Sequence, residues 1–218
     1  MDWSIWLFNL SKGTVETIYM VGISTVFTAL FGLPLGILLV ITDRNGLLPS
    51  PTVSDILGVI VNISRSLPFI ILLVVVIPIT RFVVGTTIGA TAAIVPLTLA
   101  AIPFSARVAE SGLREVDRGL VEAAQAMGCS VWQIITKVLI PEALPSLILG
   151  ITLTIISLIS YSAMAGAIGG GGLGDLAIRY GYQRFETEIM IATVILLIIL
   201  VQGIQVLGNH LAKKVLKR

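Results

Sequence analysis

Residues 189–209, IMIATVILLIILVQGIQVLGN, form a long run without a single charged side chain. A run of about 18 or more apolar residues can cross a bilayer as an α-helix, because the hydrocarbon core is ~30 Å thick. Four further segments are long enough; three are uncharged, and the one at 56–80 contains only Arg65. We therefore expect five transmembrane helices, at about 17–42, 56–80, 82–106, 143–168 and 189–210.

The composition excludes a soluble domain. Hydrophobic residues make up 56% of the 218 and charged residues 12%, whereas soluble domains carry about 25% charged residues. Backbone N–H and C=O groups find no partners in lipid, so the spans must be helical. The sequence thus predicts one all-α transmembrane domain, residues 1–218, which passes several times through a cell (inner or plasma) membrane and contacts its lipid.

Lysine and arginine are distributed unequally between the two sides of such a bundle. Five spans place the termini on opposite sides. With the C-terminus in the cytoplasm and Arg65 at the inner interface, ten basic residues lie inside (Arg44, Arg65, Arg107, Arg114, Arg118, Lys137, Lys213, Lys214, Lys217 and Arg218) and four outside (Lys12, Arg81, Arg179 and Arg184). Because cytoplasmic loops carry the basic excess, we expect the N-terminus outside and the C-terminus in the cytoplasm.

Small and polar residues indicate close helix packing or a solute path. Gly32 and Gly36 let another helix approach closely. In the fourth span, residues at steps of three or four share one face: Ser146, Gly150, Thr154, Ser157, Tyr161 and Met164. Such a face suits a water-filled path and a tight helix contact equally well. The candidate path residues are its outer four, of which Met164 is flexible and apolar enough to act as a gate. The glycine-rich segment 165–174 predicts a mobile outer loop.

Arg65 is a charge within a predicted span. Asn62, Arg65 and Ser66 share one helix face by their spacing. An ionisable residue inside the membrane is a functional candidate. The alternative role is structural, since a long basic side chain can reach the inner headgroups or brace a neighbouring subunit.

The expected cytoplasmic loop, 107–142, predicts two short helices outside the membrane. Asp117 can cap the first helix, and Gly128 suits the turn that ends it. Ser130, with a glutamine three residues later, forms the capping-box pattern of a second helix. Pro141 suits the first turn of the span that follows.

This loop resembles the EAA loop of ABC-importer permeases. The shared spacing is EAA at 122–124, three residues, glycine at 128, nine residues, and a hydrophobic-proline ending, here VLIP at 138–141. Val138 and Ile140 are mild departures from that ending. In the family this loop docks on the ATPase subunit, which implies a coupling role for Glu122, Ala123, Ala124, Gly128 and Pro141. The loop also offers a small-residue surface that a partner can approach, formed by Ala123, Ala124 and Ala126.

The likeness extends to methionine-import permeases at 65–73, 93–98 and 161–174. It implies a type I ABC-importer bundle built from a second copy of this chain, two cytoplasmic ATPase subunits that bind ATP and Mg²⁺, and an extracytoplasmic solute-binding protein. The chain itself contains no Gly-x4-Gly-Lys-Ser/Thr phosphate loop and no nucleophile–base constellation. We therefore expect no enzyme activity, cofactor or metal site in this chain, and no nucleic-acid partner.

Two other functions remain open from the sequence. One is an ABC permease for an osmoprotectant or another amino acid, because glycine-rich outer loops are similar there. The other is an autonomous channel or ion-driven carrier. Carriers often show inverted repeats and midplane charges; five spans do not divide into equal halves, and no acidic residue lies deep within any run.

Overall fold

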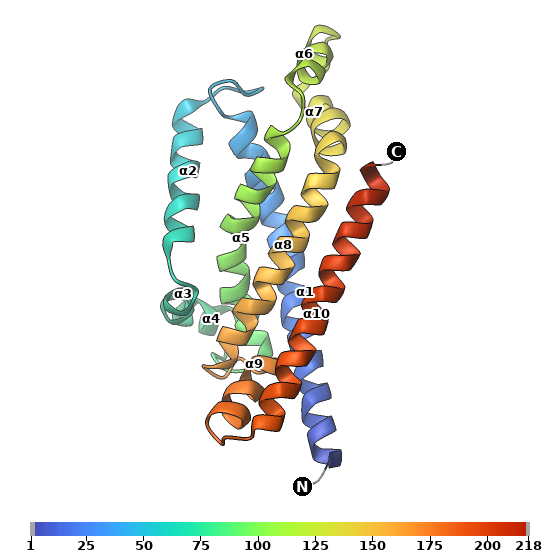
Figure 1. Ribbon diagram of the computed structural model, residues 1–218. Helices are drawn as coiled ribbons and strands as arrows, with labels where there is room; N and C mark the ends of the chain where they lie inside the picture. The colour runs from blue at the N-terminus through green and yellow to red at the C-terminus, as the bar shows by residue number, and fades with distance from the viewer. Residues whose placement is uncertain (1–2, 217–218) are drawn as a thin grey trace.

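The computed structural model describes residues 3–216 and shows an elongated bundle of helices, without a strand in this range (Figure 1). The elements in chain order are α1 (Trp3–Ile41), α2 (Pro51–Ser66), α3 (Phe69–Val75), α4 (Ile77–Val84), α5 (Ala90–Arg114), α6 (Arg118–Ala126), α7 (Val131–Ile134), the π-helix η1 (Ile135–Leu139), α8 (Ile140–Gly166), α9 (Gly172–Leu176), the π-helix η2 (Ala177–Tyr182) and α10 (Thr187–Leu216). Lys217 and Arg218, which enter the charge count, lie outside the described residues.

Four helical stretches are long and apolar enough to cross a membrane: Trp6–Ile41, Ala90–Arg114, Val131–Gly166 and Thr187–Leu216. A fifth crossing results if α2 and α3, which meet at a bend of 102°, form one broken span. The predicted all-α membrane fold with about five spans is therefore confirmed. α1, α8 and α10 cover three of the expected spans, and each begins earlier than expected.

The second expected span, 56–80, is broken rather than continuous. α2 ends at Ser66, and Leu67 takes an extended conformation (φ −77°, ψ 125°) before Pro68. The proline ring clashes with a helical conformation of the residue before it, which ends the helix. A new helix, α3, then begins at Phe69 in another direction.

The third expected span, 82–106, lies further along the chain. Gly85, with a φ of +80°, closes α4, and α5 begins only at Ala90. α5 then continues to Arg114, into the segment expected to be loop. The basic and acidic side chains of its last turns pair with one another at helical spacing, so they extend the helix instead of ending it.

α1 and α5 approach closely along two glycines of α1. A Cβ atom added to Gly36 would lie 2.7 Å from the carbonyl oxygen of Ala106 and 2.8 Å from Cβ of Ala109. A Cβ atom on Gly32 would lie 2.9 Å from Cβ of Ser105. A larger residue cannot be placed here without separating the helices, which confirms the close approach expected at this pair of glycines.

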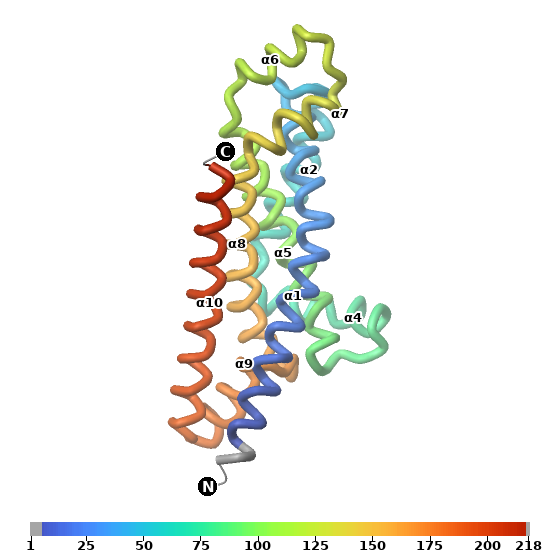
Figure 2. The backbone as a smooth tube through the Cα atoms, turned by 90° about the vertical axis from the view of Figure 1, so that its right-hand side faces the viewer, coloured from blue at the N-terminus to red at the C-terminus, as the bar shows by residue number. Residues whose placement is uncertain are grey.

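The bundle has two distinct ends. α6 and α7 project from one end, here called the α6 end, and α9 closes the other, the α9 end (Figures 1 and 2). α1 starts at the α9 end, and α10 finishes toward the α6 end (Figure 1). α2, α3 and α4 lie on one side of α5 and α8, and α10 lies on the other (Figures 1 and 2).

Candidate coupling site and solute path

The tip formed by α6 and α7 is built by local capping interactions. The Asp117 carboxylate accepts a hydrogen bond from the Gly119 N–H (2.7 Å) at the start of α6. Gly128 turns the chain with a φ of +77°. At α7, the Gln133 N–H donates to Ser130 Oγ (3.3 Å) and the Ser130 N–H donates to Gln133 Oε1 (2.8 Å). The predicted helix, glycine turn and capped second helix are confirmed.

The tip presents one face to the bundle and another to its surroundings. Ala124 (2% exposed) and Ile134 (1%) belong to an apolar cluster with residues of α1, α5 and η1. On the outer side, Met127 is 76% exposed and Trp132 is 72% exposed. Large apolar side chains gathered on an exposed surface are typical of a protein-binding site.

The residues of the EAA motif divide between these two faces. Glu122, Ala123 and Gly128 are exposed, whereas Ala124 is buried against the bundle. The expectation that the loop alanines jointly form a surface for a partner is therefore wrong for Ala124. Its small side chain instead lets α6 pack closely on the apolar cluster.

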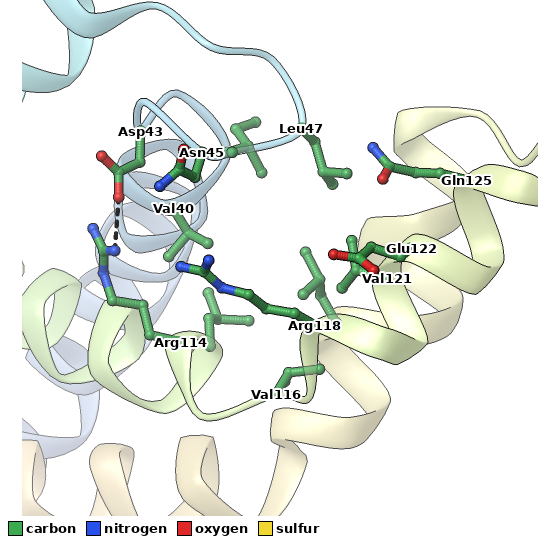
Figure 3. Close-up of a pocket in the computed structure, with 14 residues that line it drawn as sticks. Val40, Asp43, Asn45, Leu47, Arg114, Val116, Arg118, Val121, Glu122 and Gln125 are labelled. Carbon is green, nitrogen blue, oxygen red and sulfur yellow. Dashed lines mark hydrogen bonds and ion pairs between the residues drawn. The ribbon is translucent and has the colours of Figure 1, made fainter.

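A cavity of about 590 Å³ separates α6 from the end of α1 and the turn that follows α1 (Figure 3). Arg118, Glu122 and Gln125 border it from α6, and Asn45 and Leu47 border it from the turn. The side chains of Arg118 and Glu122 extend from α6 toward the α1 side (Figure 3). The turn after α1 thus belongs to the same site, which no local sequence pattern indicates.

An ion-pair cluster joins α1, α2 and α5 near the α6 end. Glu110, which is 6% exposed, accepts hydrogen bonds from Arg107 Nη1 (2.6 Å) and Arg114 Nη2 (2.9 Å). Arg114 Nη1 also donates to Asp43 (2.7 Å), and Arg107 Nη2 donates to Asn62 Oδ1 (3.0 Å). This cluster was not predicted from the sequence, although spacings of three and four between opposite charges on a helix are a signal for it.

Asp43 lies just beyond α1 and pairs with Arg114 of this cluster. The hydrogen bond from Arg114 holds the pKa of the Asp43 carboxyl below its ordinary value, and the backbone N–H of Arg44 adds to the effect. Both donors favour the ionised form. The link between the turn after α1 and the end of α5 therefore persists through neutral and mildly acidic pH.

Pro141 lies in the first turn of α8, as expected, but α8 does not begin a separate helix. Helical structure runs without interruption from Val131 to Gly166, through α7, η1 and α8. The N–H of Ile140 donates to the carbonyl of Ile135, five residues earlier. Proline has no N–H to donate to the preceding turn, and a π turn is the local form the helix takes here.

The polar stripe of α8 divides into a packed part and an open part. Thr154 is 2% exposed and donates its hydroxyl to the carbonyl of Gly150 (2.8 Å). Thr154 therefore does not line a path within this chain, because it fills a helix contact. Ser157 and Tyr161 are half-buried, and Met164 is 46% exposed. The tight helix contact thus holds for the packed part, and the solute path stays a prediction for the open part.

Met164 lines an apolar groove of about 680 Å³ formed by residues of α3, α8 and α10, including Ile70 and Val201. One turn earlier on α8, the ring of Tyr161 stacks on Phe69 of α3, with 4.6 Å between centroids. This stack joins the short helix after the break in the second span to α8. The geometry therefore keeps Met164 and Tyr161 together as candidates for lining a solute path.

The glycine-rich segment at 165–174, expected to be a mobile outer loop, is instead held against α1 and enters α9 at Gly172. The Gly172 N–H donates to Glu16 Oε2 (2.8 Å), and the Leu173 N–H donates to Thr17 Oγ1 (2.9 Å). Leu173 is fully buried. The glycines serve close packing at the α9 end.

Arg65 is exposed in the last turn of α2, away from the α6 end. It lies about 21 Å along the helix axis from Pro51, at 1.5 Å per residue. A headgroup layer is only about 5–7 Å deep. The expected position of Arg65 at the inner interface stays a prediction, and the distance along α2 favours a deeper one.

These features together define a class of protein. Several helices can cross a membrane, and a capped tip with exposed apolar side chains projects from one end of the bundle. Within residues 3–216, no group of three or more His, Cys, Asp or Glu side chains is placed to hold a metal ion. The chain is a multi-pass membrane protein with a projecting helical tip.

The chain belongs to the family of binding-protein-dependent transport system inner membrane components, whose sequence pattern matches residues 32–217. It is 54% identical over 206 residues to the probable D-methionine transport system permease protein MetI of Vibrio cholerae, across 94% of this chain and 92% of that protein. A protein of the same name from Pasteurella multocida is 51% identical over 211 residues, across 96% of each.

A solved structure titled as an inward-facing conformation of the MetNI methionine ABC transporter contains a chain with the same fold. It matches with a TM-score of 0.95 and 46% identity, over 99% of both chains. The resemblance to ABC-importer permeases, drawn from the EAA loop, is confirmed, as is the inner-membrane location.

Proposed function

We propose that this chain is the permease subunit of an ATP-driven importer of methionine, in which two copies form the path across the membrane. The high identity to MetI proteins over nearly the whole chain supports the substrate. The similarity in fold to a MetNI chain supports assembly with ATPase subunits. The family description supports a solute-binding protein as a further partner.

The observation that carries this proposal is the tip. Met127 and Trp132 are its most exposed large apolar residues, and such a surface is suited to binding a partner protein. In our proposal the ATPase subunit covers this surface and contacts Glu122, Ala123 and Gly128. Ala124 and Pro141 act from the other side by fixing the tip to the bundle. ATP and Mg²⁺ then bind the partner, since this sequence has no phosphate-binding loop.

In this proposal the α6 end faces the cytoplasm. Basic residues gather there, namely Arg44, Arg107, Arg114, Arg118, Lys137, Lys213 and Lys214, whereas the α9 end and its approaches carry Lys12, Arg81, Arg179 and Arg184. The cytoplasmic side of membrane proteins carries such an excess. The solute-binding protein would then approach the α9 end.

Transport follows from moving the tip relative to the bundle. Closure of two ATPase subunits around ATP would bring the two tips together. The buried face of each tip packs on α1 and α5, so displacement of the tip would displace these helices too. Close-packed elements of this kind switch between discrete arrangements, here inward-open and outward-open.

Gly128→Val tests the coupling role. No heavy atom lies within 4 Å of where a Cβ would stand, so there is room for a side chain. The φ of +77° nevertheless costs a β-branched residue about 1–3 kcal/mol. In vesicles containing the full transporter, we expect Gly128→Val to lose methionine uptake and stimulated ATP hydrolysis. Gly128→Asn should keep both, because Asn tolerates this conformation. Wild-type values in Gly128→Val would refute the role.

For the path, we propose that Met164 is the gate and that Tyr161 and Ser157 line its approach. Met164→Ala removes most of the side chain from the apolar groove and should raise both solute leak and ATP turnover without solute. Met164→Leu keeps the volume and should stay tight. Equal leak in the wild type and Met164→Ala would show that the gate lies elsewhere.

The substrate and the partners are tested separately from the path. A pull-down in mild detergent should recover a stoichiometric ATPase subunit; its absence would favour an autonomous channel or carrier.

The cognate solute-binding protein should be stabilised thermally by D- or L-methionine. Stabilisation by a quaternary-amine osmoprotectant alone would replace methionine as the cargo.

A further inference from the structure

Arg65 lies in α2, which forms a fifth crossing of the membrane if it and α3 make one broken span. Asp55 is on the same helix, ten residues earlier, so the two are about 15 Å apart along the axis. That is half of the ~30 Å hydrocarbon core. If Asp55 lies at headgroup level, Arg65 lies near the middle of the membrane. Charged residues at this depth face a protein interior or a water-filled cavity, because lipid cannot solvate them.

The side of α2 that bears Arg65 is the side turned toward the bundle. Val61 is 2% exposed, and Asn62 is bound to Arg107 of α5. Arg65 follows these residues by four and three positions, so it shares their face. The opposite side of α2 is apolar and exposed, with Ile56 and Ile60 each 55% exposed and Ile63 61%. The apolar side suits lipid, and the Arg65 side does not.

Two arginines near the contact of α2 and α5 differ in their partners. Arg107 binds the Glu110 carboxylate (2.6 Å), the Gly58 carbonyl (3.1 Å) and Asn62 Oδ1 (3.0 Å). The ion pairs found within residues 3–216 include none to Arg65, which is exposed. Arg107 thus has a structural role in the chain itself, whereas Arg65 offers free donors.

We propose that Arg65 binds the carboxylate of the amino acid as it crosses the membrane, which makes it a specificity-determining residue. A guanidinium can hold a carboxylate through two parallel hydrogen bonds. The Asn62 amide is a second donor, since its oxygen is already occupied by Arg107. The cargo carboxylate must lose water near the midplane, and a fixed cation replaces that hydration. This inference rests on the proposed import of a zwitterionic amino acid.

The test measures solute moved per ATP hydrolysed by the full transporter in vesicles, with methionine-loaded binding protein in excess. The transporter with Arg65→Gln should still show stimulated ATP hydrolysis. It should move at least roughly 10-fold less methionine per ATP than the wild type, because this is the loss expected when a hydrogen bond to a charged group is removed. Arg65→Lys keeps the charge without the two-pronged geometry and should fall between. Arg81→Gln, which removes an exposed arginine of α4, should behave as the wild type.

Several results would overturn the inference. The first is an unchanged ratio of methionine to ATP in Arg65→Gln. The second is failure of Arg65→Gln to assemble into the transporter. In that case Arg65 has a structural role if Arg65→Lys transports methionine at the wild-type ratio, or if Arg65→Lys fails to assemble too. The third is that Arg65→Gln retains transport but loses thermal stability only in vesicles that contain phosphatidylglycerol. That result would show that Arg65 binds a lipid headgroup. If the wild type moves no methionine at all, the proposed function itself fails.

Discussion

The two sides of this bundle are built differently. On one side, α1 and α5 meet through glycines with helix backbones in close approach, and much of α5 is buried. On the other side, α2, α3 and α4 are short, broken by prolines, and mostly exposed; in α2 only Val61 is buried. The contact between α1 and α5 is complete within one chain, although the outer face of α1 is exposed. The second side presents surface that lipid, a solute path or a second copy must cover.

The difference shows where the chain can change shape. A close-packed pair resists small shifts, because any displacement creates overlap or voids. Short helices with few buried residues can reorient at lower cost. The ion-pair cluster around Glu110 and the stack of Phe69 on Tyr161 are the named links between the two sides. Breaking one link or one close contact tests the comparison.

The largest effect is expected from Glu110→Gln. This change removes the charge that two arginines share, and Arg107 is the link from α5 to α2. Removing one partner of a fully buried ion pair costs about 3–5 kcal/mol of unfolding free energy; because both arginines retain contact with solvent, we expect a loss of about 3 kcal/mol here. Unfolding of the purified protein in detergent micelles measures the loss. Glu188→Gln changes an exposed glutamate and should shift stability by less than about 1 kcal/mol.

A smaller effect, of opposite sign on the two sides, is expected from two glycine substitutions. Gly36→Ala places a Cβ 2.7 Å from a backbone carbonyl of α5 and should destabilise by about 1–3 kcal/mol through overpacking. Gly58→Ala meets only the end of Arg107, at 3.5 Å, and should stabilise α2 by about 0.5–1 kcal/mol. Equal destabilisation by both, in the same micelle assay, would mean that the two sides are packed alike.

The smallest effect concerns pH. The pKa of Asp43 is lower in the folded protein than its ordinary value, so its contribution is present above that ordinary value, about pH 4. The contribution is lost as the pH falls through the lowered pKa. The wild-type thermal midpoint should therefore drop more steeply below about pH 4 than that of Asp43→Asn. Asp55→Asn is the control, and a parallel drop in all three proteins would exclude the Asp43 link.

Local sequence signals predicted the parts of the structure that depend on neighbouring residues. The caps at Asp117 and Ser130 and the turn at Gly128 each involve groups a few positions apart. The break before Pro68 follows from the same kind of signal, since a residue that precedes proline avoids the helical conformation. The long apolar run of the second expected span concealed this break.

Contacts between distant segments could not be predicted in this way. Ala124 is buried because α1 and α5 lie behind α6, and for this reason it cannot contact a partner. The path candidate Thr154 is buried for the same reason, because a stripe of small residues does not specify which helix covers it. The cavity beside Glu122 needs the turn after α1, whose position follows from the whole bundle.

The uninterrupted helix from Val131 to Gly166 fixes a rotational phase between its two ends. Trp132 on the tip and Met164 in the groove are carried by the same helix, so the direction in which one points determines the direction of the other. Each residue advances an α-helix by about 100°. One residue inserted or deleted between them would rotate Met164 by about 100° relative to Trp132, although the sequences around both residues stayed the same. The number of residues in this segment is therefore as much a part of the site as their identity.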